Sequence, residues 1–226
     1  MEKACLSHPL RWGVLGLCLL ALASCAEPPP GYVGVDPNAA RLARSAKHGR
    51  LRSMRALLDK GVSPNVKDEG GWTPLMWASA KEKNDVVALL LARGADAELR
   101  NNQGETALML AAKWTRAPTV RALIKGGVRT EARDRLGWSA LMWAAFKGRT
   151  EIVRVLIESG ANPNATDVVG NRPIMLAARS GHADVVKLLL ESGVDPDQRT
   201  RNGDTAQKMA ETSGYPEIVA LLKKQR

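Results

Sequence analysis

The stretch GWTPLMWA, residues 71–78, decides the fold of this chain. Thr73 is a residue type that caps the start of a helix, and Pro74 suits the first helical position because its missing N–H needs no partner there. Leu75 and Ala78 then share one helical face, where small side chains allow a neighbouring helix to come close. The stretch therefore predicts a short helix that begins at Pro74 and packs tightly against another element.

A second helix is predicted over residues 85–93. Its apolar positions recur at helical spacing and form one stripe, made of Val86, Val87, Leu90 and Leu91. Gly94 ends this helix, because glycine adopts the left-handed conformation that often follows a helix. Together the two predicted helices form a helical hairpin.

The same hairpin recurs at a fixed interval of 33 residues. Residues that hold equivalent places are Gly71, Gly104, Gly137, Gly170 and Gly203; Ala78, Ala111, Ala144, Ala177 and Ala210; and Leu57, Leu90, Leu123, Leu156, Leu189 and Leu222. A single unit of this size cannot bury its apolar face, so such units stack against each other and fold as an array.

This pattern resembles the ankyrin repeat, whose G-x-T-P-L-H-x-A helix opening, second helix and G-A-D turn are followed in GWTPLMWA, VVALLLARGADA, GWSALMWAA, EIVRVLIESGANPNA and VVKLLLESGVDPD. The resemblance covers residues 36–226 and implies an all-α solenoid of stacked helix-turn-helix units with β-hairpin-like loops. We count four full repeats with an N-terminal and a C-terminal capping repeat. Asp36-Pro37 opens the first cap, and Gln207 and Lys208 replace apolar residues in the last.

Three departures from the family pattern have local consequences. Methionine stands where the family usually has histidine, so we expect the hairpin-bracing hydrogen bond of that histidine to be lost and apolar packing to replace it. Arg172 replaces the capping threonine of its repeat, and Thr115 and Pro118 predict an irregular unit after Asn101. The methionines are Met76, Met109, Met142 and Met175.

The N-terminus has the features of an export signal. Residues 13–24 are uncharged and apolar, too short to span a bilayer comfortably. They end in Leu22-Ala23-Ser24-Cys25, which resembles the bacterial lipobox, a resemblance that implies acylation of Cys25 after removal of residues 1–24. Residues 25–35 are then the acylated cysteine and a flexible linker. Because Ala26 replaces the aspartate that signals inner-membrane retention, we expect a lipid-anchored protein of the cell envelope, at the outer membrane facing the periplasm. A plain secretory signal that leaves a soluble periplasmic protein is the alternative.

No residue pattern indicates catalysis, a metal or a cofactor, and we expect no enzyme. Residues 26–226 hold no cysteine, and the only histidines there are His48 and His182. A Ser/His/Asp set is formally possible, but His182 occupies the place of the structural Gly-His loop of ankyrin repeats. Two distant histidines also lack the close ligand spacing of zinc sites.

The family resemblance places partner binding on a concave face formed by hairpin tips and the ends of the first helices. Aromatic and basic residues at these places are typical of binding hot spots. We expect Trp72 and Trp138 to be exposed, with packing on each other or on adjacent tips as the alternative, whereas Trp77 and Trp143 should pack inside. The candidate binding residues are Trp72, Lys81, Arg100, Lys113, Trp114, Arg133, Trp138, Phe146 and Lys147.

The net charge of +10 favours acidic partners and opposes self-association, so we expect a monomer. The leading hypothesis is a non-catalytic module that binds a protein partner with an acidic surface. A ladder of cations at Lys67, Arg100, Arg133 and Arg199 also permits the alternative, an envelope structural protein that binds an anionic polymer. Nucleic acid is not expected, because the export signal places the protein where nucleic acid is scarce.

Overall fold

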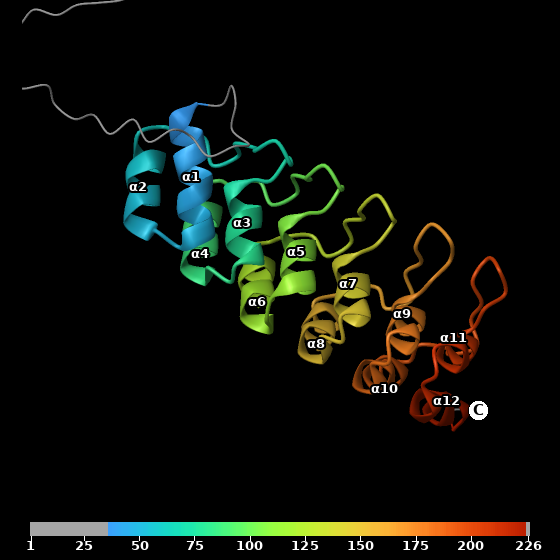
Figure 1. Cartoon of the computed structure of the whole chain (residues 1–226). Coiled ribbons are helices and arrows are strands. Elements are labelled where there is room, and N and C mark those ends of the chain that lie inside the picture. Colours follow the sequence, from blue (N-terminus) through green and yellow to red (C-terminus); the bar gives the residue numbers. More distant parts are fainter. Residues whose placement is uncertain (1–35, 225–226) are drawn as a thin grey trace, which may run out of the picture.

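The computed structural model describes residues 36–224, which form a curved stack of helix pairs (Figure 1). The predicted signal peptide, the acylation site at Cys25 and the linker lie outside the described residues. Across residues 36–224 the secondary structure is helical, and no strand is present. The helix pairs are α1 (Pro37–His48) with α2 (Leu51–Asp59), α3 (Pro74–Ala80) with α4 (Asn84–Ala92), α5 (Ala107–Trp114) with α6 (Ala117–Lys125), α7 (Ala140–Phe146) with α8 (Thr150–Glu158), α9 (Pro173–Arg179) with α10 (Ala183–Glu191), and α11 (Ala206–Thr212) with α12 (Pro216–Lys223).

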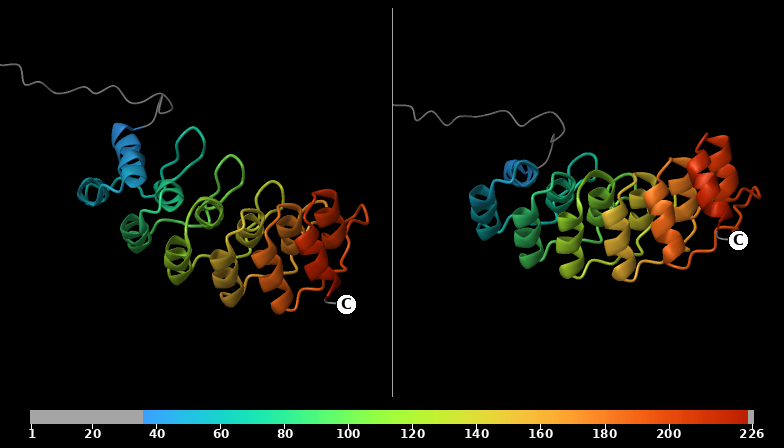
Figure 2. Two further views of the ribbon diagram at one scale, coloured as in Figure 1. Left: turned by 60° about the horizontal axis from the view of Figure 1, so that its bottom comes forward. Right: turned by 90° about the horizontal axis from the view of Figure 1, so that it is seen from below.

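The helices form two layers that run along the stack (Figure 2). The first helix of each pair packs on the first helix of the next pair, and the second helices from α4 to α12 do the same. We call the first helix of each pair the inner helix. In the inner helices from α3 to α11, alanine at the equivalent place is fully buried, which lets the helices approach closely. These alanines are Ala78, Ala111, Ala144, Ala177 and Ala210. The predicted all-α repeat solenoid is confirmed.

Each inner helix begins where the sequence predicts, and most have a side-chain cap. The Thr73 hydroxyl accepts a hydrogen bond from the Met76 N–H at 3.2 Å, whereas Arg172 makes no such bond at the start of α9. The four methionines that replace histidine are buried, which confirms the expected apolar packing. We expected the hairpin to lose the bracing hydrogen bond that the family's histidine makes. This loss is only partial, because the Met76 sulfur accepts a hydrogen bond from the Thr73 N–H at 3.4 Å.

The turn between the two helices of a pair needs one residue in the left-handed conformation. Glycine holds this place in most pairs, for example Gly148 with φ of 67°. Glu82 adopts the same conformation with φ of 56°, although a side chain makes it unfavourable. Thr115 instead stays extended, with φ of −122°, because a β-branched residue strongly resists the left-handed region. The predicted irregular unit is therefore confirmed, and Thr115 is its cause.

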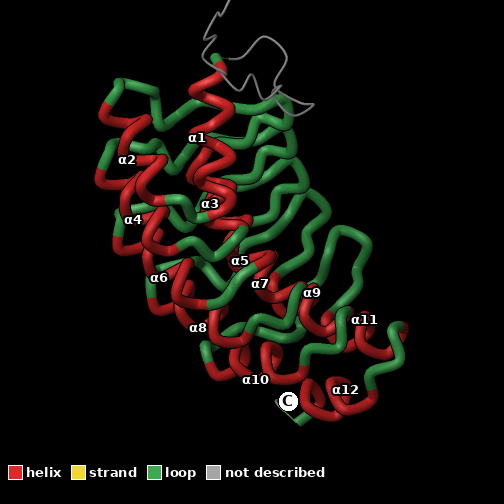
Figure 3. The backbone as a smooth tube through the Cα atoms, turned by 60° about the vertical axis from the view of Figure 1, so that its left-hand side comes forward, coloured by secondary structure: helices red, strands yellow, loops and turns green. Residues whose placement is uncertain are grey.

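Hairpin loops project side by side from one edge of the stack (Figure 3). The turn of each loop donates a backbone hydrogen bond to the turn before it, as from Val168 N–H to Leu136 O at 3.4 Å. A Cβ added at Gly137 would lie 3.0 Å from the backbone nitrogen of Val168, so this approach requires glycine. The loops therefore form a continuous ladder along the edge.

Candidate functional site

A hollow of about 670 Å³ opens on the inner surface between the second and third repeats. Its walls come from the hairpins before α3 and α5 and from the last residues of those two helices. The lining residues are Trp72, Trp77, Ala80, Lys81, Gln103, Glu105, Lys113 and Trp114. Four of the nine candidate binding residues, namely Trp72, Lys81, Lys113 and Trp114, therefore meet in one place.

Trp114 ends α5 and is the most exposed aromatic residue among those described, with 54% of its surface accessible. Two ammonium groups lie over its ring, Lys113 Nζ at 5.3 Å and Lys147 Nζ at 5.5 Å from the centroid. Cations at this distance are attracted to the ring face. Trp114 is thus an exposed apolar surface with two positive charges close to its ring.

Lys113 is held in place from two sides. Its ammonium lies 2.9 Å from Glu105 Oε1 and 3.9 Å from the centroid of Trp143. Glu105 is itself only 6% exposed, and its other oxygen accepts a hydrogen bond from Asn101 Nδ2 at 2.9 Å. Because the side chain is fixed in advance, Lys113 loses little conformational entropy when a partner binds.

We expected Trp138 to be exposed at its hairpin tip, but the structure shows it buried. It is only 8% exposed, its ring centroid lies 4.6 Å from Trp143 and 5.2 Å from Phe146, and its Nε1 donates to Asp167 Oδ2 at 3.1 Å. Part of the alternative prediction, packing on the adjacent tip, therefore holds for Trp138. Its first role is structural, because it joins two neighbouring hairpins.

Trp72 is half-buried and remains on the wall of the hollow, with its ring centroid 4.5 Å from that of Trp77. Trp77 Nε1 donates to Asp68 Oδ2 at 2.9 Å, and Trp143 Nε1 donates to Asp134 Oδ2 at 2.8 Å. These bonds tie the inner helices to the hairpins that precede them. The predicted packing role of Trp77 and Trp143 is confirmed, and Trp77 lines the hollow as well.

The basic ladder contacts the protein's own backbone. Lys67 Nζ donates to Arg100 O at 2.9 Å, Arg100 donates to Arg133 O, and Arg133 donates to Thr166 O at 2.9 Å. These three cations each link their repeat to the equivalent residue of the next, whereas Arg199 donates to Gly203 O within its own hairpin. Part of the hydrogen-bonding capacity of Lys67, Arg100 and Arg133 is used between repeats, and binding of an anionic partner by this ladder stays a prediction.

The remaining candidates border the hollow or lie further along the inner surface. Lys81 caps the end of α3 and is exposed. Phe146 and Lys147 follow at the end of α7, with Lys147 Nζ 5.2 Å from the Phe146 ring centroid. His182 contacts the Phe146 carbonyl oxygen through Nε2 at 3.0 Å, which supports the structural role predicted for His182.

Some exposed apolar residues were not among the sequence candidates. Leu136, Val168 and Val169 are 53%, 54% and 48% exposed, and they occupy the turns of two adjacent hairpins. The sequence could have indicated these residues, because they are apolar at turn positions where the hairpin before α5 has the polar residues Asn102 and Gln103.

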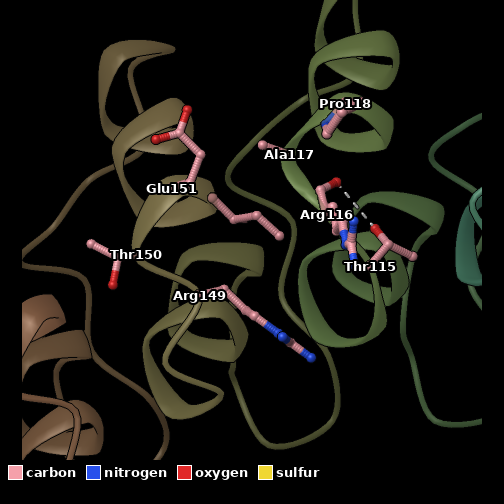
Figure 4. A pocket seen from close by; sticks show the side chains of 8 residues that line it. Thr115, Arg116, Ala117, Pro118, Arg149, Thr150 and Glu151 are labelled. Carbon is pink, nitrogen blue, oxygen red and sulfur yellow. Dashed lines mark hydrogen bonds between the residues drawn. The ribbon is translucent and has the colours of Figure 1, made fainter.

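A second hollow, of about 350 Å³, lies at the turn that Thr115 keeps extended. Figure 4 shows its lining side chains, which come from the turn between α5 and α6 and from the start of α8. Arg116 and Arg149 contribute positive charge there. No titratable group that could act as a nucleophile or a base lines this hollow apart from the exposed Glu151.

Within residues 36–224 no group of three or more His, Cys, Asp or Glu side chains is arranged to hold a metal ion. The described helices are also all too short or too polar to cross a bilayer.

Comparison with known proteins gives one family. The family model "Ankyrin repeats (3 copies)" matches residues 32–101, 80–167 and 166–226. A search of curated proteins found no match. Proteins of this family generally mediate protein–protein interactions and are typically not catalytic. Because the matched segments extend from residue 32 to residue 226, the chain belongs to the ankyrin-repeat family.

Proposed function

We propose that this protein is a non-catalytic module that binds a protein partner at the hollow around Trp114. The observation that carries the proposal is an exposed tryptophan with two cations close to its ring, on the wall of a 670 Å³ hollow that Trp72 and Trp77 also line. Tryptophan in a pocket is among the commonest residues to dominate binding energy. The other residues that line the hollow form its walls around Trp114.

The charge of the hollow favours an acidic partner segment. Lys81 and Lys147 add positive charge beside Trp114, while the one carboxylate in the lining, Glu105, is paired with Lys113. An extended segment with an apolar side chain next to Asp or Glu would satisfy both the ring and the cations. Such complementarity mainly increases the association rate and the specificity.

We further propose that the protein is attached to the bacterial cell envelope through acylated Cys25. Support comes from the sequence Leu22-Ala23-Ser24-Cys25 after an apolar segment, and Ala26 favours the outer membrane. Two or three acyl chains give stable attachment where a single chain is marginal. The partner is then a protein of the periplasm or of the same membrane.

Binding of an anionic polymer, the alternative, has less support. It depends on the basic ladder, and Lys67, Arg100 and Arg133 donate hydrogen bonds to backbone carbonyls of the next repeat. Salt distinguishes the two functions, because polymer binding rests on charge alone and falls steeply when about 1 M salt shortens the Debye length to ~3 Å. Binding anchored by Trp114 should persist.

The test is capture of partners from a bacterial envelope extract with the full chain as bait. Trp114→Ala should remove the proteins that the wild type retains, and Arg116→Ala, an exposed change two residues away at the helix turn, should retain them. Equal capture by Trp114→Ala and the wild type would exclude the hollow as the binding site. Palmitate labelling of wild type and Cys25→Ala tests the anchor separately.

A further inference from the structure

The exposed aliphatic residues Leu136, Val168 and Val169, here called the tip patch, lie at the outer end of two adjacent hairpins. The two turns are joined by the hydrogen bond from Val168 N–H to Leu136 O, so the three residues lie in neighbouring turns at the same edge of the stack. Valine is an unusual choice in a tight turn, where polar residues and glycine are favoured. Exposed apolar residues that lie close together beside charged residues are typical of surfaces that contact a partner or a membrane.

The charge around the tip patch is positive. Arg135 precedes Leu136 in its turn, and Arg201 lies in the next hairpin, where its N–H donates to Val169 O at 3.2 Å. Both arginines are exposed. The nearby carboxylates Asp134 and Asp167 are buried and accept hydrogen bonds from tryptophan and backbone groups, so they add no exposed negative charge.

The position of the tip patch agrees with the place where the chain would be tethered. The first helix of every pair begins at the hairpin edge, and α1 begins there too, directly after Asp36 (Figure 1). Residues 25–35 comprise 11 residues, which span at most about 40 Å when extended. Helix pairs that stack about 10 Å apart place the hairpins before α7 and α9 about 30 Å and about 40 Å from the first pair. The tether can therefore reach a membrane that the tip patch also touches.

We propose that the tip patch docks on an anionic membrane surface, with the aliphatic side chains entering the interface and Arg135 and Arg201 contacting lipid phosphates. This inference rests on the proposed anchor at Cys25. Docking would hold the stack with its hairpin edge toward the lipid. Amphipathic surfaces with aliphatic residues beside cations bind in this way, with each basic residue contributing to attraction by anionic lipid.

A fluorescent probe at the tip patch tests the proposal on the acylated mature chain, residues 25–226, from which Cys5 and Cys18 have been removed with the signal peptide. Because residues 26–226 have no cysteine, Val169→Cys provides the one thiol free for labelling when the Cys25 sulfur is acylated. The labelled chain is reconstituted in vesicles of phosphatidylcholine, with or without phosphatidylglycerol. Arg116→Cys, on the turn at the opposite edge, is the matched control.

We expect the emission of the probe at residue 169 to shift to the blue and brighten severalfold in the anionic vesicles. The emission of the probe at residue 116 should be that of a probe in water with both kinds of vesicle. Changing Arg135 or Arg201 to Gln should lower the ratio of docked to undocked chain about fivefold each. If the chain floats with the vesicles while both probes report water, the tip patch does not bind lipid and the docking proposal is overturned. If the chain does not float, the anchor itself fails, and the docking proposal fails with it.

Discussion

Lys113 Nζ lies 2.9 Å from Glu105 Oε1, so a residue at the end of an inner helix is bonded to the hairpin that precedes the same helix. The side chain of Glu105 is 7% exposed and that of Lys113 is 19% exposed. The pair thus fixes the shape of the hollow and also sets the charge beside Trp114. This double role makes its contributions to stability and to binding separable by experiment.

Glu105→Gln should reduce the free energy of unfolding by about 2 kcal/mol, because it leaves the Lys113 ammonium without its partner in a largely buried place. The value is below that of a fully buried pair because Lys113 keeps some contact with water. Urea unfolding measures the change. Arg121→Gln breaks the exposed pair of Arg121 with Glu151 and should cost less than about 0.5 kcal/mol. Equal losses for the two variants would mean that burial does not matter here.

Trp138→Ala should destabilise the protein by about 3–5 kcal/mol, as expected for a buried tryptophan that joins two hairpins. Trp114→Ala should change stability by only about 1 kcal/mol, because about half of the residue is exposed. Thermal and urea unfolding provide the comparison. A large loss of stability in Trp114→Ala would show that this residue supports the fold and would undermine its proposed role in binding.

Glu82→Gly should stabilise the protein by about 1 kcal/mol, because glycine adopts the left-handed conformation of this turn without a penalty. Glu82→Ala is the control, since it removes the carboxylate and keeps the strained backbone. Its midpoint in urea should stay near that of the wild type. A gain in both variants would attribute the effect to the charge of Glu82 instead of to its φ of 56°.

Arg133→Met should weaken the contact between the fourth and fifth repeats, where Arg133 donates to Thr166 O, at a cost of about 1 kcal/mol. Hydrogen exchange should quicken at the amides of both hairpins and stay unchanged in α3 and α4. Arg129→Met, an exposed change in the same loop, is the control. Unaltered exchange together with lost partner capture would instead make Arg133 a partner contact.

Most of the fold was predictable because its determinants are local and repeat. Thr73 and Pro74 start a helix by their own geometry, and a period of 33 residues specifies how many times the unit recurs. Even the irregular turn followed from the sequence, since a β-branched residue such as Thr115 resists a conformation that Gly148 adopts freely. The exposure of Trp114 also agreed with its place at the end of an inner helix.

The sequence by itself determined the helix pairs, their stacking and the general location of the inner surface. Tertiary structure alone decided which aromatic and basic residues remain available on that surface. Trp138 is covered because Asp167, 29 residues later, accepts its N–H, and Arg100 is engaged because the carbonyl of Arg133 lies within reach. The physical reason is that side chains such as these find partners in the next repeat, so their burial and hydrogen bonding depend on residues that their own segment does not contain.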